Sequence, residues 1–320
     1  MSRGRGANGS RAAVCAVRIC LAALAGGVLL SCSSAPKQSD TVMTVKLQAD
    51  QMASSGQAYY RQGRYELALQ FFSQALTQYT SVDDGEGIAR SYNEVGKCYI
   101  SLGQAHDAEG VFLKARERAR EDGAAALLFD SSLNLGELYL VQGDAEKART
   151  VLREQNQPGA VHTPSQTAQL AHDLGTAEKS LGNSAAALDW FGQSLKINLA
   201  NKYLAEAASD YYMIASVYSK DGRYDEALKN ATLALAYDKQ VESSPGIAKD
   251  LYALGLISAK KGDAAAAFDW FQRAYNVCTT LGFKDDMKKA LAGLIDSADS
   301  LGRTADADAY RKALADMGSS

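Results

Sequence analysis

The stretch GQAYYRQGRYELALQFFSQAL, residues 56–76, contains the pattern that decides the fold. Gly56 precedes a tyrosine by three residues, and Gly63 follows four residues after that tyrosine. Beyond Gly63, Ala68 and Phe72 lie four residues apart. Spacings of three and four place side chains on one face of a helix. Because glycine commonly ends a helix in the left-handed conformation, the stretch predicts two helices joined by a turn at Gly63.

This pattern recurs along most of the chain. The turn glycine returns at intervals of 40, 40, 39, 40, 40 and 40 residues. A fixed period of this length is the signature of a solenoid, in which stacked repeats bury a shared core. Only 4 prolines occur in 320 residues, which also favours helix. The turn glycines are Gly63, Gly103, Gly143, Gly182, Gly222, Gly262 and Gly302.

Small residues recur inside the predicted helices as well. A residue without a large side chain lets two helix backbones approach closely, and aromatic side chains then fill the space between adjacent repeats. In the first helix of the repeats these positions are Gly56, Gly96, Gly136, Gly175, Ala215 and Gly255. In the second helix they are Ala68, Ala108, Ala148, Ala187, Ala227 and Ala267.

Each unit resembles a tetratricopeptide repeat, whose W-x2-L-G-x2-Y and A-x3-F motifs form a helix–turn–helix. The resemblance covers roughly residues 49–317, and the 40-residue period is similar to the subclass with lengthened helices. It implies an all-α solenoid of about seven repeats, or about fourteen antiparallel helices, in a right-handed superhelix. The first helix of each repeat is expected to line the concave face. We expect the solenoid at residues 47–320, with a possible hinge at 156–166, where two prolines shorten the third repeat.

The N-terminus differs from the rest of the chain. Four arginines and no acidic residue precede ICLAALAGGVLL, residues 19–30, which carries no charge. A basic segment followed by a short apolar run is typical of a secretory signal. A membrane-spanning helix needs about 20 apolar residues, so this run is too short to span. The alternative is a disordered basic tail followed by a core helix.

The apolar run ends in LLSC, residues 29–32, which resembles the lipobox of bacterial lipoproteins. The resemblance implies a signal peptide at 1–31 and a diacylglyceryl or acyl lipid on Cys32, which would be the only cofactor. Each buried methylene contributes about 0.8 kcal/mol, so two or three chains anchor a protein stably. The polar segment at 32–46 is predicted to be a flexible tether. Ordinary cleavage, leaving Cys32 as a free thiol, is the alternative.

Composition gives no indication of nucleic-acid binding or catalysis. The formal charge is −3, and removal of residues 1–31 takes away four arginines and no acid, giving −7. Such a chain lacks the basic patch that nucleic acid requires. Cys98 and Cys278 lie at apolar helical positions and are expected to be buried. None of the 3 histidines lies at metal-ligand spacing, so we predict no metal site, no catalytic residues and no enzyme activity.

What remains is a binding surface. In tetratricopeptide proteins, ligand contacts come from particular positions of the first helix of each repeat. Asn134 falls where relatives with longer repeats carry an asparagine that bonds a partner's backbone. Tyr212 and Tyr252 share one position in neighbouring repeats, and could form a stacking ledge or pack between helices. The candidate partner-binding residues are Arg90, Asn93, Lys97, Asn134, Glu137, His172, Thr176, Tyr212, Ser216 and Tyr252.

Two functions fit these features. The first is a membrane-anchored scaffold or adaptor of the bacterial cell envelope, which binds a protein or peptide on its concave surface and meets the membrane only through its lipid. The second is an accessory lipoprotein of a solute-transport system, acting with a periplasmic binding protein or a small hydrophobic ligand. The residue after Cys32 is serine rather than aspartate, which favours the outer membrane, facing the periplasm.

Overall fold

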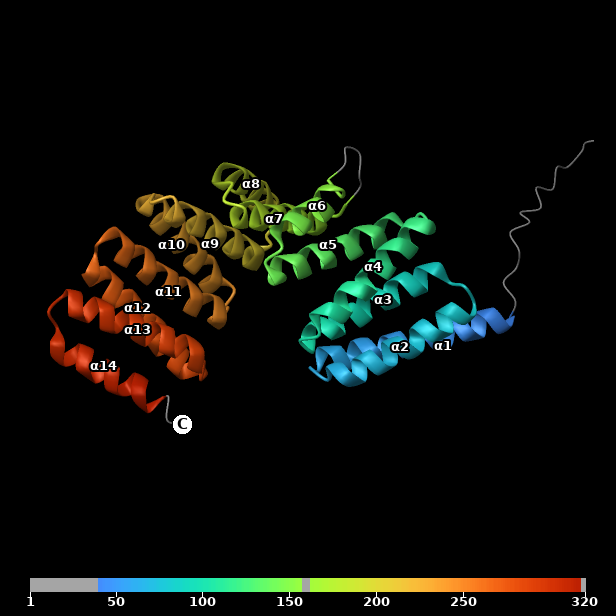
Figure 1. Ribbon diagram of the computed structural model, residues 1–320, viewed down its shortest axis with the longest axis horizontal. Coiled ribbons are helices and arrows are strands. Elements are labelled where there is room, and N and C mark those ends of the chain that lie inside the picture. Colours follow the sequence, from blue (N-terminus) through green and yellow to red (C-terminus); the bar gives the residue numbers. More distant parts are fainter. Residues whose placement is uncertain (1–39, 157–161, 318–320) are drawn as a thin grey trace, which may run out of the picture. The chain divides into compact units, whose positions relative to one another are not determined.

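The computed structural model describes residues 40–156 and 162–317. The expected signal peptide, Cys32 and the first part of the tether lie outside these residues. The described chain is built from helices that form seven consecutive hairpins (Figure 1). The helices are α1 (Asp40–Arg61), α2 (Tyr65–Ser81), α3 (Gly85–Ser101), α4 (Ala105–Glu121), α5 (Ala125–Gln142), α6 (Ala145–Arg153), α7 (Pro164–Ser180), α8 (Ser184–Asn201), α9 (Leu204–Lys220), α10 (Tyr224–Gln240), α11 (Ser244–Lys261), α12 (Ala264–Leu281), α13 (Lys284–Ser300) and α14 (Thr304–Asp316).

The turns inside the hairpins follow the sequence prediction. All seven turn glycines have positive φ angles, from 69° at Gly302 to 88° at Gly262. A second set of positive φ angles lies in the turns between hairpins, and there three of the residues are not glycine. These residues are Asp83, Lys202 and Glu242, with φ angles of 49°, 60° and 56°. The left-handed conformation costs an L-residue roughly 1–2 kcal/mol, so these three turns are less favourable than their glycine equivalents.

The two helices of a hairpin touch at the predicted small residues. A Cβ atom added to Gly96 would lie 2.3 Å from Cε1 of Phe112, and one added to Gly56 would lie 2.8 Å from Phe72. The fifth hairpin differs, because Ala215 replaces the glycine and Ala231 occupies the phenylalanine position. Both alanines are buried in the same core cluster. The extra methyl group on one helix is thus matched by a smaller side chain on the other.

Consecutive helices pack against each other throughout the described chain, so the hairpins form one continuous stack. Four pairs of successive odd-numbered helices also contact each other directly: α3 with α5, α5 with α7, α7 with α9, and α11 with α13. Even-numbered helices of the described chain make no contact of similar extent with one another. The odd-numbered helices therefore lie closer together. We call the surface that they form the inner face.

The third hairpin is the shortest, as the two prolines predicted. Helix α6 has 9 residues, whereas its neighbours α5 and α7 have 18 and 17. Pro164 is the first residue of α7, and Thr163 caps the helix by accepting a hydrogen bond from the backbone N–H of Gln166. Residues 164–166 of the expected hinge are therefore helical, and residues 157–161 lie outside the described chain. Whether the rest of this segment acts as a hinge stays a prediction.

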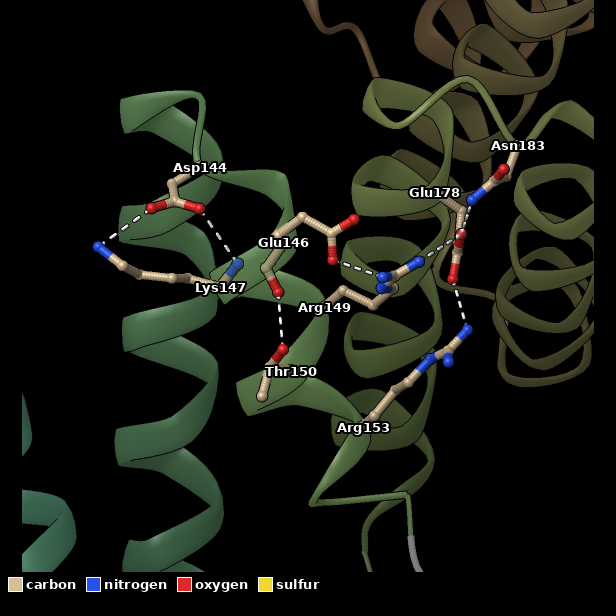
Figure 2. A network of polar contacts seen from close by, with 8 residues as sticks. All are labelled: Asp144, Glu146, Lys147, Arg149, Thr150, Arg153, Glu178 and Asn183. Carbon is tan, nitrogen blue, oxygen red and sulfur yellow. Dashed lines mark hydrogen bonds and ion pairs between the residues drawn. The ribbon is translucent and has the colours of Figure 1, made fainter.

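An ion-pair network joins α6 to α7 across this connection. Glu178 of α7 is 1% exposed and accepts a hydrogen bond from Arg153 at 2.6 Å and one from Asn183 at 2.7 Å (Figure 2). Arg149 of α6 lies 3.8 Å from the same carboxylate. Loss of Glu178 would leave two guanidinium groups without this buried partner. These contacts hold the short helix against the fourth hairpin.

Part of the segment predicted as a flexible tether, residues 32–46, is helical. Helix α1 begins at Asp40, so residues 40–46 are helical, and residues 32–39 lie outside the described chain. An ion pair and a buried side chain attach the beginning of α1 to the rest of the solenoid. Nζ of Lys46 forms an ion pair with Oδ2 of Asp84 at 3.0 Å, and Ala49 is completely buried. The polar composition of this segment concealed its contact with the second hairpin.

Cys98 and Cys278 are buried and free, as expected. Burial raises the pKa of the Cys98 thiol to about 12, so this side chain behaves as a small apolar group at neutral pH. None of the helices in the described residues is both long enough and apolar enough to cross a membrane.

Candidate functional site

The inner face carries two grooves. The first, the N-terminal groove, consists of three hollows of about 390, 280 and 330 Å³ that all share Glu137. Its walls come mainly from α3, α5, α7 and α9. The second, the C-terminal groove, consists of two hollows of about 200 and 410 Å³ that share Leu256. Its walls come from α9, α11, α12 and α13.

Five of the predicted residues come together in the N-terminal groove. Arg90, Asn93, Lys97, Asn134 and Glu137 line one of its hollows, and the spacing of one repeat places them on neighbouring helices. The three charged side chains among them already form ion pairs or hydrogen bonds within the protein. Arg90 pairs with a glutamate one helical turn earlier, at 2.5 Å, and Lys97 pairs with a glutamate at 3.1 Å. The amide of Gln169 donates to the Glu137 carboxylate.

Two asparagine side chains form the floor of this hollow. Nδ2 of Asn134 donates to Oδ1 of Asn93 at 3.3 Å, and Nδ2 of Asn93 donates to the hydroxyl of Ser131 at 3.3 Å. Asn93 is 3% exposed, whereas Asn134 is half-buried at the surface of the groove. A primary amide has two N–H groups and a carbonyl oxygen with two lone pairs. Asn134 therefore keeps hydrogen-bonding capacity for a peptide backbone.

His172 lies in the third hollow of the N-terminal groove and leads to a buried network. Its Nδ1 lies 2.7 Å from Oδ1 of Asp210, which is completely buried. Oδ2 of the same aspartate accepts a hydrogen bond from Nδ2 of Asn198 at 2.8 Å. The imidazole edge also faces the ring of Phe191, with centroids 5.4 Å apart. Thr176 contributes nothing to this network, because its hydroxyl donates to the backbone oxygen of His172 within α7.

The contact between His172 and Asp210 repeats the geometry of Asn93 and Ser131. Asn93 and His172 each lie three positions before the small residue of their own repeat. Their partners, Ser131 and Asp210, each lie five positions before the small residue of the next repeat. Tyr212 and Asp250 occupy the same two positions one repeat later. Several predicted binding residues therefore also tie one hairpin to the next.

Sequence reasoning missed three members of the polar cluster: Asp173, Asn198 and Asp210. All three are buried, with 7%, 3% and 0% of their surface exposed. Burial, reinforced by the charge of Glu137, raises the pKa of Asp173 well above that of an ordinary aspartate. A signal for Asp210 was present, since the next repeat has Asp250 at the equivalent position. Asn198 lies on an even-numbered helix, which the prediction left out.

Tyr212, Ser216 and Tyr252 lie in the C-terminal groove, apart from the other candidates. The ammonium of Lys249 lies 3.8 Å from the ring centroid of Tyr212, in a cation–π contact. The ring of Tyr252 packs against Phe271, with centroids 5.5 Å apart. Tyr212 thus contacts Lys249 and Tyr252 contacts Phe271, which supports packing of the two rings between helices rather than a stacking ledge.

The two grooves differ in charge. Glu137, Asp173 and Glu206 line one hollow of the N-terminal groove, together with hydroxyl and amide side chains. Lys220, Lys260 and Lys289 line the C-terminal groove together with Asp296. Within residues 40–156 and 162–317, no three histidine, cysteine, aspartate or glutamate side chains are grouped so that they could hold a metal ion.

Comparison with known families agrees with the repeat pattern. The family model described as "Tetratricopeptide repeat" matches residues 50–121 and 205–280. The chain carries tetratricopeptide repeats. Because the remaining hairpins have the same turn glycines and the same helix pairing, they extend these repeats into an all-α tetratricopeptide solenoid. A search among curated proteins found no match to the sequence.

Solved structures show the same fold at low sequence identity. The apo form of the quorum sensor NprR from B. thuringiensis has 19% identity and a TM-score of 0.68, covering 87% of this chain and 80% of NprR. Aspartyl phosphate phosphatase F from Bacillus subtilis has 15% identity and a TM-score of 0.64, covering 87% and 72%. A Rap protein complexed with competence and sporulation factor has 16% identity and a TM-score of 0.58, covering 85% and 75%.

Proposed function

We propose that this protein is a lipid-anchored adaptor of the bacterial cell envelope that binds a protein or peptide segment along its inner face. It acts by binding rather than by catalysis. The observation that carries the proposal is the N-terminal groove, where Asn93 and Asn134 lie side by side under an open hollow. Amide side chains in such a groove can bond the backbone of an extended segment.

The comparisons support binding of this kind. One of the similar structures is a Rap protein in complex with competence and sporulation factor, and another is a quorum sensor. Two of the three hollows of the N-terminal groove are lined mainly by charged, amide and hydroxyl side chains. Such a lining favours a polar segment over a hydrophobic solute, which is why we prefer an adaptor to an accessory of solute transport.

The anchoring part of the proposal rests on the sequence. A signal peptide at 1–31 and a lipid on Cys32 would export the protein and hold it at the membrane, with the outer membrane favoured. The solenoid would then face the periplasm. The protein would contact the membrane only through this lipid.

Site-specific photocrosslinking in cells tests the binding surface. A photoreactive amino acid at position 97 lies in the N-terminal groove, whereas one at position 120 lies on α4, where the arginine side chain is 51% exposed. We expect a discrete crosslinked partner from position 97 and none from position 120. Replacing Asn93 and Asn134 with alanine should remove that crosslink, whereas Asn201→Ala, on the exposed end of α8, should retain it. A partner captured equally from both positions would contradict the assignment of the inner face.

A further inference from the structure

The hollow between α7 and α9 contains acceptor groups from four helices. Glu137 comes from α5, Asp173 from α7, Asn198 from α8 and Glu206 from α9. They line a volume of about 330 Å³, large enough for a long side chain. The residues that line it include no lysine or arginine. We call this hollow the acidic pocket.

Two acceptor atoms in the acidic pocket lack a hydrogen-bond partner among the described residues. They are Oδ2 of Asp173 and Oδ1 of Asn198, which belong to side chains that are 93% and 97% buried. A buried polar atom left without a partner costs about 1–3 kcal/mol. Native proteins rarely carry this cost without a reason, and here both atoms belong to residues that line one pocket.

The orientation of the Asn198 amide is fixed by its neighbours. Its Nδ2 donates to Oδ2 of Asp210 at 2.8 Å and to the hydroxyl of Ser194 at 3.2 Å. Rotating the amide by half a turn would place its carbonyl oxygen against the Asp210 carboxylate, which is unfavourable because both are acceptors. The other oxygen of Asp210 is engaged with His172. This network keeps Oδ1 of Asn198 free to accept a hydrogen bond.

A pocket rich in acceptors and poor in donors suits a cation with many N–H groups. Arginine has five donors in a planar fork and is more weakly hydrated than lysine, so its transfer into a buried site costs less. Hydrogen bonds that involve a charged group contribute about 1.5–3 kcal/mol each. The lysines of the C-terminal groove would repel the same group, which directs it to the acidic pocket.

We propose that the acidic pocket binds the guanidinium group of an arginine in the partner segment, an assignment that rests on the proposed peptide-binding function. The pocket shares Glu137 and Gln169 with the adjoining hollow that contains Asn134. A segment whose backbone meets Asn134 can therefore place an arginine in the pocket. The raised pKa of Asp173 agrees with this assignment, because a bound guanidinium would supply the positive charge that restores the carboxylate.

The test uses the full chain and two small probes. Nα-acetyl-arginine N-methylamide carries the guanidinium, and Nα-acetyl-citrulline N-methylamide is its uncharged isostere. Each probe is titrated into isotope-labelled protein, and the side-chain amide signal of Asn198 is followed by NMR. We expect saturable shifts with the arginine probe at millimolar concentration, and none with the citrulline probe.

Two variants locate the binding. Asp173→Asn should weaken the arginine probe about 10- to 100-fold, the equivalent of one charged hydrogen bond. Asp189→Asn removes the same charge from an exposed position of α8 outside the pocket and should leave the affinity unchanged. Asp173→Asn should also melt at a higher temperature than the native chain, because folding no longer has to protonate or desolvate a buried carboxyl group. That increase would show that the loss of binding does not come from unfolding.

Equal binding of the two probes, or full affinity in Asp173→Asn, would overturn the pocket assignment. Crosslinking at position 97 reports on the proposed function separately. A crosslinked partner without arginine binding would retain the adaptor function and reject the pocket. Arginine binding without any crosslinked partner would retain the pocket and reject the adaptor function.

Discussion

Replacing Gly96 with alanine tests how the two helices of a hairpin pack. The new Cβ atom would lie 2.3 Å from Cε1 of Phe112, whereas ordinary contacts begin at 3.4 Å, so the ring must move by more than 1 Å. Phe112 is 1% exposed and belongs to a core cluster, which leaves it little room. Overpacking of this kind costs about 1–3 kcal/mol, and the severity of the overlap places the cost near the upper end.

The same substitution also has a stabilising effect, because alanine favours helix over glycine by about 1 kcal/mol. We therefore expect Gly96→Ala to destabilise the protein by about 2 kcal/mol in all. Gly110 supplies the matched control. It lies on the exposed side of α4, and nothing lies within 4 Å of its added Cβ atom. Gly110→Ala should therefore stabilise the protein by about 1 kcal/mol.

Urea unfolding followed by circular dichroism measures both changes. Gly96→Ala should lower the midpoint concentration, and Gly110→Ala should raise it. In a Phe112→Ala background, where the ring is absent, Gly96→Ala should become stabilising, as the pairing of Ala215 with Ala231 in the fifth hairpin suggests. Equal increases in midpoint for Gly96→Ala and Gly110→Ala in the native background would refute the close approach at Gly96.

Three further predictions concern the turns, the pH dependence and the anchor. Lys202→Gly should raise the free energy of unfolding by about 0.5–1 kcal/mol in urea titrations, because glycine adopts positive φ without the penalty that lysine incurs; no gain would mean that the turn is unstrained. Burial and the charge of Asp238 raise the pKa of Asp250 to about 8, so the folded state binds this proton more tightly than the unfolded state. Stability should therefore fall as pH rises from about 4 to about 8, and urea midpoints across this range should fall less in Asp250→Asn; identical pH profiles would reject the shift. Cys32→Ala should move the protein from the membrane to the soluble fraction of fractionated cells, and unchanged partitioning would reject lipid anchoring.

Much of the hairpin architecture could be predicted from the sequence because it depends on single residues with strong preferences. The turn glycines and the glycines under the aromatic rings lie where the 40-residue period places them. Gly63 and Gly96 illustrate the two kinds, since one adopts positive φ and the other admits a ring. Lys202 shows the limit of this approach, because the same backbone conformation occurs there without a glycine to signal it.

The candidate site could be predicted only in part, because its partners come from different repeats. Asn93 and Asn134 were identified from their positions within a repeat, and they meet as neighbours in the groove. Asp173 and Asn198 were missed because each matters through a buried oxygen atom that lacks a hydrogen-bond partner among the described residues. Which buried oxygen lacks a partner depends on how one hairpin sits against the next, and a linear pattern does not contain that information.

The shortness of α6 has a consequence for how the array unfolds. In a linear array each repeat is stabilised by its own contacts and by its two interfaces, so cooperativity is transmitted only as far as the weakest interface allows. Helix α6, with 9 residues, offers α7 about half the length that α2, α4, α8, α10 and α12 offer the helices that follow them, and the charges around Glu178 add to a small set of apolar contacts there. Because Glu178 is buried, salt screens its ion pairs only weakly, and the change that weakens this junction is loss of the carboxylate, which removes the shared partner of Arg149 and Arg153. The first three hairpins and the last four would then unfold as two separate cooperative blocks.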